Sequence, residues 1–220
     1  MTAAVAFDLD GVLLDSERTW AEARREVALA QGGQWPPGVE RAMMGMSSPE
    51  WAAYLRDELG VQLEAEAIID DVVGRVLAVY REHLPMLPGA EGAVRGLASQ
   101  WPLGLASSSN RPVIDAALAA SGLAGCFAAT VSSEEVARGK PAPDVYLAVA
   151  EALGVTPATC AAIEDSANGI RAAASAGMAV VAVPNGEFPP DPDVLSLAAA
   201  QIDSLHELTR ALIDRVGLPS

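Results

Sequence analysis

Short apolar runs that end in polar residues recur along this chain and alternate with Ala-rich segments of helical period. The runs are Ala3–Phe7, Leu103–Ala106, Ala128–Val131, Ala161–Ile163 and Ala179–Val183, and a weak final strand or a helix cap is expected near Gln201–Asp203. The helical segments between them include Val113–Ala120, Val145–Leu153 and Gly169–Ala176. Strands that alternate with helices form parallel sheets, and helices cover such sheets on both faces. The pattern therefore predicts an α/β fold with a three-layer core.

Residues 16 to 84 interrupt this alternation with helical segments alone. The apolar periodicity predicts helices over Ser16–Ala30, Arg41–Met44, Pro49–Leu59 and Glu66–His83, and the Pro/Gly-containing stretch Leu84–Gly89 is typical of a linker. We expect a core of residues 1–14 and 86–220, and a small helical cap domain of residues 15–85 inserted after the first strand. A cap that two adjacent linkers hold over the edge of a sheet is able to act as a lid that excludes water.

The end of the first run carries two carboxylates one residue apart, Asp8 and Asp10, followed by Gly11. Like charges this close repel each other, and burial increases the repulsion, so such a pair needs a nearby cation or a shared proton. Carboxylate oxygens suit Mg²⁺, which commonly binds a few carboxylates together with a substrate phosphate. The alternative is an Asp-Gly turn after a buried strand.

Polar residues also follow the later runs, and ligands of parallel sheets bind at the carboxyl ends of the strands. These residues are Ser107–Ser109, Ser132 and Ser133 leading toward Lys140, and Glu164 with Asp165. Lys140 is the single lysine beside thirteen arginines, and an ammonium is a compact charge suited to a phosphate. We expect these groups to converge with Asp8 and Asp10 on one cleft. Ser107 and the Glu164-Asp165 pair have helix capping as an alternative role.

Composition excludes several classes of function. The net charge of −15 argues against nucleic acid as a partner, because a phosphate backbone requires a basic surface. The apolar runs are far shorter than the roughly twenty residues that span a bilayer, and no secretory signal is recognisable. Cys126 and Cys160 have no metal-like spacing. We expect a cytoplasmic protein with no membrane partner, and a monomer because the cap covers its own site.

Four blocks taken together resemble the ordered motifs of the haloacid dehalogenase-like hydrolases. They are Asp8-Leu9-Asp10-Gly11-Val12, Leu105-Ala106-Ser107, Gly139-Lys140-Pro141-Ala142-Pro143-Asp144 and Ile163-Glu164-Asp165-Ser166-Ala167-Asn168-Gly169-Ile170. The resemblance covers essentially the whole chain. It is strongest to the branch with a helical cap after the first strand, which includes beta-phosphoglucomutase and sugar-phosphate phosphatases, and it implies a Rossmann-like core.

The resemblance also implies roles for the motif residues. Asp8 would be the nucleophile that forms an aspartyl-phosphate, and Asp10 the general acid and base. Mg²⁺ would bind the carboxylates of Asp8 and Asp165 and the backbone carbonyl of Asp10, with Glu164 bound directly or through water. Ser107 and Lys140 would bind the phosphoryl oxygens.

Within this family, individual residues separate the possible reactions. Asp10 argues against a dehalogenase, whose leaving halide needs no proton, and residues 15–85 lack the cap lysine of a phosphonatase. The beta-phosphoglucomutase pattern has a histidine where Trp20 stands and an arginine near Ser48. We therefore expect a magnesium-dependent phosphatase that hydrolyses a small phosphorylated substrate, a sugar or polyol phosphate. A phosphosugar mutase is the alternative, and a non-enzymatic binding role is disfavoured because all catalytic positions are present.

The substrate pocket is the least constrained part of the interpretation. Trp20 and Met46 are the cap residues nearest the matched motifs, and we expect them to line the pocket together with Ser108 and Asn110 of the core. Aromatic rings stack on sugar faces, and methionine adapts to varied shapes. Packing within the cap, or a helix start for Asn110, explains the same residues equally well. Arg24 is expected on a solvent-exposed helix face, although it is able to recruit anionic substrates.

Overall fold

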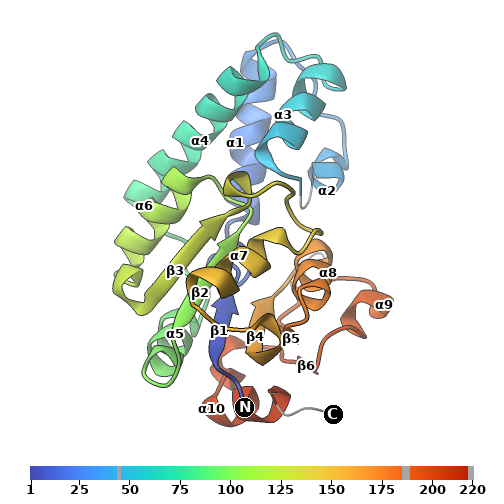
Figure 1. Ribbon diagram of the computed structural model, residues 1–220. Coiled ribbons are helices and arrows are strands. Elements are labelled where there is room, and N and C mark those ends of the chain that lie inside the picture. The colour runs from blue at the N-terminus through green and yellow to red at the C-terminus, as the bar shows by residue number, and fades with distance from the viewer. Residues whose placement is uncertain (44–45, 185–188, 218–220) are drawn as a thin grey trace.

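The computed structural model describes residues 1–43, 46–184 and 189–217. In this part of the chain a six-stranded parallel sheet has the order β3-β2-β1-β4-β5-β6 (Figure 1). Its strands are β1 (Ala4–Phe7), β2 (Leu103–Ser107), β3 (Phe127–Ser132), β4 (Cys160–Glu164), β5 (Ala179–Ala182) and β6 (Ala200–Gln201). The first strand lies at the centre, between β2 and β4, so the residues that follow these three strands emerge side by side at one edge.

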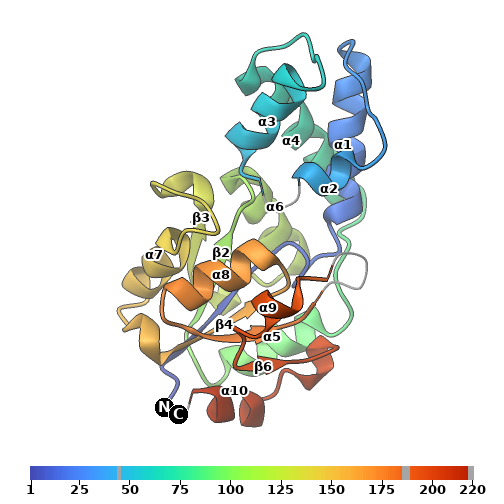
Figure 2. The ribbon, with the colours of Figure 1, turned by 90° about the vertical axis from the view of Figure 1, so that its right-hand side faces the viewer.

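Helices cover both faces of the sheet (Figure 2). The side chains of Val5 and Phe7 face the cluster that includes α5 (Ala90–Ala98), α6 (Arg111–Ser121) and α10 (Arg210–Val216). Ala4 and Ala6 face the opposite cluster, with α7 (Asp144–Ala152) and α8 (Ala167–Ser175), and the short α9 (Pro192–Leu195) packs on the same side. The predicted α/β fold with a layered parallel-sheet core is confirmed.

Small residues let α7 approach the sheet closely. A side chain on Gly104 in β2 would overlap Val149 of α7, and Ala106 lies in the same buried cluster. Tyr146 of α7 is fully buried in this layer. The close packing of α7 brings Tyr146 and the preceding Lys140 toward the ends of β1 and β4, which matters for the site described below.

Between β1 and β2 the chain forms the helical lobe at the top of Figure 1. Its helices are α1 (Glu17–Ala30), α2 (Val39–Met43), α3 (Ser48–Asp57) and α4 (Ala65–Glu82). Their bounds lie within a few residues of the predicted segments; of these, the predicted end at Met44 lies outside the described residues. Helix α4 packs against α1 and α3 and also against α6 of the sheet lobe.

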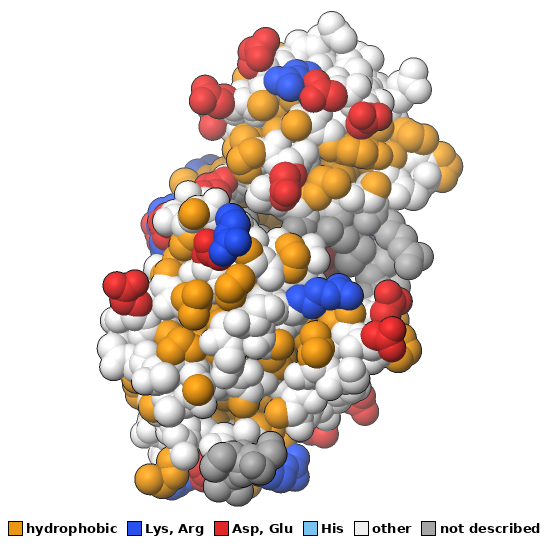
Figure 3. All heavy atoms as spheres, turned by 45° about the vertical axis from the view of Figure 1, so that its right-hand side comes forward, with side chains coloured by type: hydrophobic (Ala, Val, Ile, Leu, Met, Phe, Trp, Pro, Cys, Tyr) orange, Lys and Arg blue, Asp and Glu red, His pale blue; other side chains and the backbone are white. Residues whose placement is uncertain are grey.

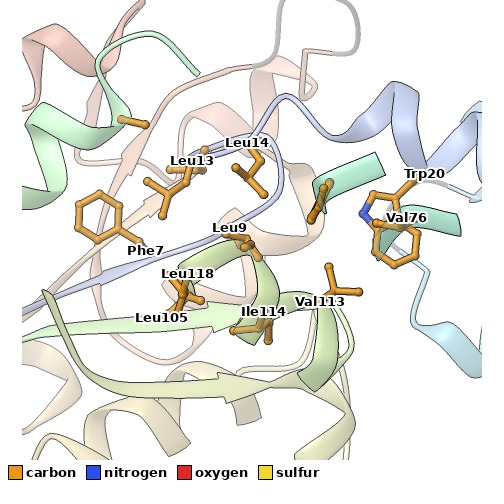
Figure 4. Packing of buried hydrophobic residues seen from close by; sticks show 14 of the residues in the cluster. Phe7, Leu9, Leu13, Leu14, Trp20, Val76, Leu105, Val113, Ile114 and Leu118 are labelled. Atoms are coloured by element: carbon orange, nitrogen blue, oxygen red, sulfur yellow. The ribbon is translucent and has the colours of Figure 1, made fainter. Parts of the chain in front are cut away.

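The two connections to this lobe run side by side. The backbone N–H of Asp15 donates to the carbonyl of Pro85 at 2.8 Å, and that of Leu87 donates to Leu13 at 2.9 Å. Apolar packing continues across the same junction: Figure 4 shows Leu9, Leu13 and Leu14 after β1, and Val113 of α6 on the side that faces Trp20 and Val76. The lobe is thus joined to the sheet both by paired linkers and by a shared buried cluster.

The surface and the helix lengths add two observations. On the face shown in Figure 3, acidic and basic side chains are dispersed over both lobes, with apolar side chains between them. Among the described helices, none combines the length and the apolar content that crossing a bilayer demands. Both cysteines are free thiols.

Candidate active site

Asp8 follows the central strand and lies at the bottom of a cavity between the two lobes. Its backbone N–H donates to the carbonyl of Ile163 at 3.0 Å, which extends the β1–β4 ladder by one residue and fixes the direction of the side chain. The carboxylate lies 2.9 Å from the ammonium of Lys140, and both side chains are buried. Burial raises the pKa of Asp8 to about 8 against the opposing effect of Lys140.

Lys140 is held between two carboxylates. Its ammonium is also 2.6 Å from Glu164, and the hydroxyl of Tyr146 donates to the same Glu164 oxygen at 2.7 Å. Burial disfavours the ammonium, but the charges of Asp8 and Glu164 outweigh that effect and raise the pKa of Lys140. The single lysine of the chain is therefore a fixed positive charge beside Asp8.

Glu164 has no free oxygen in this arrangement. Its second oxygen accepts from the backbone N–H groups of Asp165 and Ser166, at 3.2 and 3.4 Å, at the start of α8. A side chain on Gly169 would occupy the space of the Glu164 carboxylate, so glycine is required for this close approach. Glu164 thus positions Lys140 and Tyr146. Ser166 caps α8, because its hydroxyl accepts from the backbone N–H of Gly169 at 3.0 Å.

Asp165 completes a cluster of three carboxylates. One oxygen from each of Asp8, Glu164 and Asp165 lies within 4.8 Å of the others. Oxygen Oδ1 of Asp165 is buried and accepts no hydrogen bond from the described residues. Burial, with the charges of Glu164 and Asp8 close by, raises the pKa of Asp165 well above its usual range. An orphaned carboxylate oxygen beside another acidic group is the donor set that a hard divalent cation such as Mg²⁺ favours, so the residues fit the predicted metal.

Gly11 allows the loop after β1 to pass directly over this cluster. Its φ of +79° lies in the left-handed region, and a side chain there would overlap the carboxylate of Asp165. The Asp-Gly turn and the acidic cluster, which the sequence offered as alternatives, are two parts of one structure.

The side chain of Asp10 is not part of the three-carboxylate cluster and accepts three hydrogen bonds. The hydroxyl of Ser16 donates at 2.5 Å, the indole N–H of Trp20 at 3.2 Å and the hydroxyl of Ser109 at 2.6 Å. Ser16 and Trp20 belong to the helical lobe and Ser109 to the sheet lobe. Asp10 therefore accepts hydrogen bonds from both lobes that form the cavity. Its side-chain oxygens are occupied, so a metal contact by this residue would use its backbone carbonyl, as expected from the family resemblance.

Ser107, the last residue of β2, is completely buried beside this edge of the sheet. Its hydroxyl oxygen accepts the backbone N–H of Ser109 at 3.0 Å, and its own hydrogen is left for another acceptor. Ser107 is not among the side chains that line the cavity in the described structure, whereas Ser108 and Ser109 are. Asn110, not Ser107, occupies the position that starts α6.

Comparison with known proteins identifies the family. A model of the haloacid dehalogenase-like hydrolases matches residues 2–177. The chain belongs to the haloacid dehalogenase-like hydrolases. Hexitol phosphatase B of Escherichia coli (strain K12) is 35% identical over 212 residues, 94% of each chain. The predicted family and the assignment to an enzyme, a hydrolase, are confirmed.

Two solved structures resemble this hydrolase over nearly its full length. CbbY from Rhodobacter sphaeroides, in complex with phosphate, has a TM-score of 0.87 and 27% identity and covers 97% of this chain and 100% of its own. Beta-phosphoglucomutase from Clostridium difficile has a TM-score of 0.85 and 26% identity, with 99% and 97% covered. The chain therefore shares both lobes of these structures.

The cavity of this hydrolase receives side chains from both lobes, and three of the four expected pocket residues, Trp20, Met46 and Ser108, line it. The other lining residues are Asp8, Asp10, Ser16, Glu17, Arg24, Met43, Ser48, Trp51, Ser109, Lys140, Asp165, Ser166 and Asn168. The fourth, Asn110, lies behind the wall: its amide oxygen accepts the hydroxyl of Ser48 at 3.1 Å, and its amide nitrogen donates to Glu134 at 2.6 Å. Asn110 thus joins α3 of the helical lobe to the sheet lobe.

Arg24 lines the cavity, although the sequence favoured a solvent-exposed position and left recruitment of anionic substrates as the alternative. The expectation of a solvent-exposed face is wrong, because the guanidinium lies 5.3 Å from the ring centre of Trp20 and 5.2 Å from that of Trp51. The first contact follows from the i,i+4 spacing of Trp20 and Arg24 on one helix, a signal that the sequence contains. The second joins α1 to α3 and depends on tertiary packing.

Proposed function

We propose that this hydrolase is a magnesium-dependent phosphatase that releases phosphate from a small phosphorylated metabolite, a sugar or polyol phosphate, through an aspartyl-phosphate on Asp8. The observation that carries the proposal is the convergence of Asp8, Lys140 and Asp165 at the edge of the sheet, with Lys140 2.9 Å from Asp8. The name of hexitol phosphatase B supports the substrate class.

The carboxylates of Asp8 and Asp165 and the backbone carbonyl of Asp10 would hold Mg²⁺. Glu164 fits a supporting role better than direct ligation, because both of its oxygens already accept hydrogen bonds. When bound, the cation supplies positive charge that offsets the repulsion between Asp8 and the phosphate. Lys140 and the Ser107 hydroxyl bind the non-bridging oxygens, where charge is spread in the transition state.

The reaction has two displacements at phosphorus. A carboxylate oxygen of Asp8 bonds to phosphorus while the ester P–O bond breaks, and Asp10 donates its proton to the departing alkoxide. Water then attacks the phosphorus of the aspartyl-phosphate and gives a proton to Asp10. The bond between phosphorus and Asp8 breaks, which releases inorganic phosphate and restores both carboxyl groups. The hydrogen bonds from Ser16, Trp20 and Ser109 keep the Asp10 carboxyl within the cavity.

The helical lobe, residues 15–85, acts in this proposal as the cap over a core of residues 1–14 and 86–220. Ser16 and Trp20 of this lobe donate to Asp10 of the sheet lobe, so in this proposal cap closure and the placement of the acid occur together. A closed cap also excludes water other than the attacking molecule. The cytoplasmic location and the monomeric state stay predictions.

A phosphosugar mutase is the second candidate, because of the structural similarity to beta-phosphoglucomutase. A mutase must hold the second phosphate of a bisphosphate, and the sequence offers Ser48 where the mutase pattern has an arginine. Here the Ser48 hydroxyl already donates to Asn110. Hydrolysis is therefore the better supported reaction.

The test is release of inorganic phosphate from a panel of sugar, polyol and nucleotide monophosphates, with Mg²⁺ or with a chelator. We expect release from at least one sugar or polyol phosphate, dependent on Mg²⁺ and abolished by the chelator. Activity that persists in the chelator contradicts the metal requirement. Isomer conversion of a hexose 1-phosphate, primed with a bisphosphate and faster than phosphate release, favours the mutase instead.

A further inference from the structure

Arg24 gives the cap side of the cavity a positive charge with an unusual environment. It lies on α1 and reaches over the rings of Trp20 and Trp51, whose centres are 6.5 Å apart at an angle of 56°. Cation–π contacts stabilise the charge through the ring faces, but the in-plane N–H groups of a guanidinium gain no hydrogen bonds from them. The two indoles therefore hold the guanidinium of Arg24 in place and leave its N–H donors available to a hydrogen-bond acceptor from a ligand.

The donors of Arg24 have no acceptor among the described residues. Its Nε is buried and without a hydrogen-bond partner, and the guanidinium forms no ion pair within 4 Å in the described part of the chain. Burial lowers the pKa of Arg24 to about 10, against the opposing charges of Glu17 and Asp10. Leaving a buried donor unpaired is unfavourable, and more so for a charged group. A ligand that supplies the missing acceptor would remove that penalty.

The position of Arg24 shows where the ligand group would lie. Arg24 lines the same cavity as Asp8, and the other basic side chain among the described lining residues, Lys140, is already paired with Asp8 and Glu164. A phosphate transferred to Asp8 uses Lys140 at the bottom of the cavity. Arg24 is then available to the opposite end of the same substrate molecule, under the cap.

We propose that Arg24 is a specificity-determining residue that binds a carboxylate at the end of the substrate remote from the transferred phosphate. A guanidinium presents two parallel N–H groups, which match the two oxygens of a planar carboxylate. A second phosphate fits less well, because its greater negative charge would lie near Asp10 and Glu17, the acidic groups that act on Arg24. The substrate class is thus a phosphorylated sugar acid.

This inference rests on the proposed phosphatase function and favours, among small sugar-derived phosphate esters, those that also carry a carboxylate over neutral sugar and polyol phosphates. A matched pair of esters tests it: gluconate 6-phosphate ends in a carboxylate where sorbitol 6-phosphate ends in a neutral CH₂OH group. We expect kcat/KM for the acid to exceed that for the polyol at least tenfold. Fructose 1,6-bisphosphate tests a second phosphate in place of the carboxylate, and p-nitrophenyl phosphate reports phosphatase activity without any remote group.

Variants assign the discrimination to Arg24. Arg24→Gln is expected to bring the acid-to-polyol ratio of kcat/KM close to one, mainly through a higher KM for the acid, and Arg24→Lys to keep part of it. The ratio is informative even where a variant loses some activity toward both esters. Arg25→Gln removes the same charge from the next, exposed position of α1 and is expected to leave the ratio as in the wild type.

The outcomes separate this inference from the function on which it rests. A wild-type ratio at or below one, an unchanged ratio in Arg24→Gln, or a preference for the bisphosphate over the acid overturns the carboxylate assignment while phosphatase activity stands. No release from any of the four esters overturns the proposed function, and the assignment of Arg24 with it. If Arg24 only braces the two indoles, the ratio stays unchanged in Arg24→Gln.

Discussion

The two walls of the cavity differ in how their polar groups are satisfied. On the sheet side, Lys140 lies 2.9 Å from Asp8 and 2.6 Å from Glu164, and all three side chains are buried. On the cap side, Arg24 lies over the rings of Trp20 and Trp51, Met43 and Met46 line the same cavity, and the buried Nε of Arg24 has no hydrogen-bond partner among the described residues. A rigid charged wall suits a phosphoryl group that is the same in every substrate, whereas a wall of indole rings and methionines with one arginine and a few other polar side chains suits the part that varies between substrates. The comparison predicts large catalytic effects for core substitutions and smaller, substrate-dependent effects for cap substitutions.

Asp8→Asn is expected to have the largest effect. An amide is a far weaker nucleophile than a carboxylate, so phosphate release should fall at least about 10⁴-fold, as for nucleophile removal in other covalent mechanisms. The variant is expected to fold, because Asn preserves the shape of Asp8 and removes a buried charge. Steady-state kcat with the best substrate of the panel is the measurement.

Asp115→Asn is the matched control for that substitution. Asp115 lies on α6 with an exposed side chain, and its contact with Arg111 spans 3.5 Å at the surface. We expect wild-type kcat from this variant. Retention of more than about 1% of the activity in Asp8→Asn would show that Asp8 is not the nucleophile. It would also contradict the prediction that substitutions in the charged wall have the largest catalytic effects.

Gly169→Ala tests whether the charged wall is as rigid as its contacts indicate. The added methyl group would overlap the Glu164 carboxylate, which must then shift and release Lys140 and Tyr146. Overpacking of this kind destabilises proteins by about 1–3 kcal/mol. The midpoint of urea denaturation should fall accordingly, and kcat should fall with it because Lys140 is no longer fixed beside Asp8.

Gly96→Ala provides the opposite expectation for the same chemical change. Gly96 lies in the interior of α5, and a Cβ there meets nothing within 4 Å. Alanine favours a helix over glycine by roughly 0.5–1 kcal/mol, so this variant should be more stable than the wild type. Equal midpoints of urea denaturation for Gly169→Ala and Gly96→Ala would show that the Glu164 carboxylate can shift at little cost in stability.

Magnesium binding offers a readout that does not depend on substrate. A ligand present at ten times its Kd stabilises the folded state by about 1.4 kcal/mol, which raises the Tm of a chain of this size by about 3–5 °C. Asp165→Asn should abolish that shift, because it removes the charge of the orphaned ligand oxygen. NaCl at matched ionic strength is the control, and an equal shift with Mg²⁺ in the variant would place the cation elsewhere.

The residues of the charged wall could be predicted from the sequence, because each motif lies at the carboxyl end of a strand and these ends meet at one edge of a parallel sheet. Asp8, Ser107 and Glu164 are far apart in the chain, but Asp8 follows β1, Ser107 and Glu164 end β2 and β4, and β1 lies between those two strands. Hydrogen bonding within the site was less predictable. Ser16 stands at the start of α1 as expected, yet its hydroxyl donates to Asp10, and Ser166 caps α8 in place of Glu164 or Asp165.

The contacts of the cap wall could mostly not be predicted from the sequence, because they join helices whose relative positions no sequence motif indicates. Trp51 meets Arg24 only through the packing of α3 on α1, and Asn110 meets Ser48 only where the two lobes touch. A helical period identifies the buried face of each helix but not its partner. Residues such as Arg24, which lie between two faces, are therefore assigned to solvent by default.

Trp20→Phe is expected to have the smallest effect, and it tests the one place where the cap wall contacts the catalytic machinery. Phenylalanine keeps an aromatic face for Arg24 but removes the indole N–H that donates to Asp10. Asp10 retains the hydroxyl donors of Ser16 and Ser109, which are the shorter contacts at 2.5 and 2.6 Å. Loss of one of these three hydrogen bonds should lower kcat by about 3- to 10-fold.

The split between kcat and KM shows which wall Trp20 serves. If its N–H positions Asp10, kcat falls for every ester of the panel, while KM changes little. If Trp20 serves only the substrate, KM rises for some esters and kcat is unchanged. Trp101→Phe is the matched control, because its indole N–H donates to the carbonyl of Thr2, outside the cavity, at 3.1 Å. Wild-type kinetics in Trp101→Phe, together with a uniform loss of kcat in Trp20→Phe, would show that Trp20 of the cap positions Asp10 for catalysis.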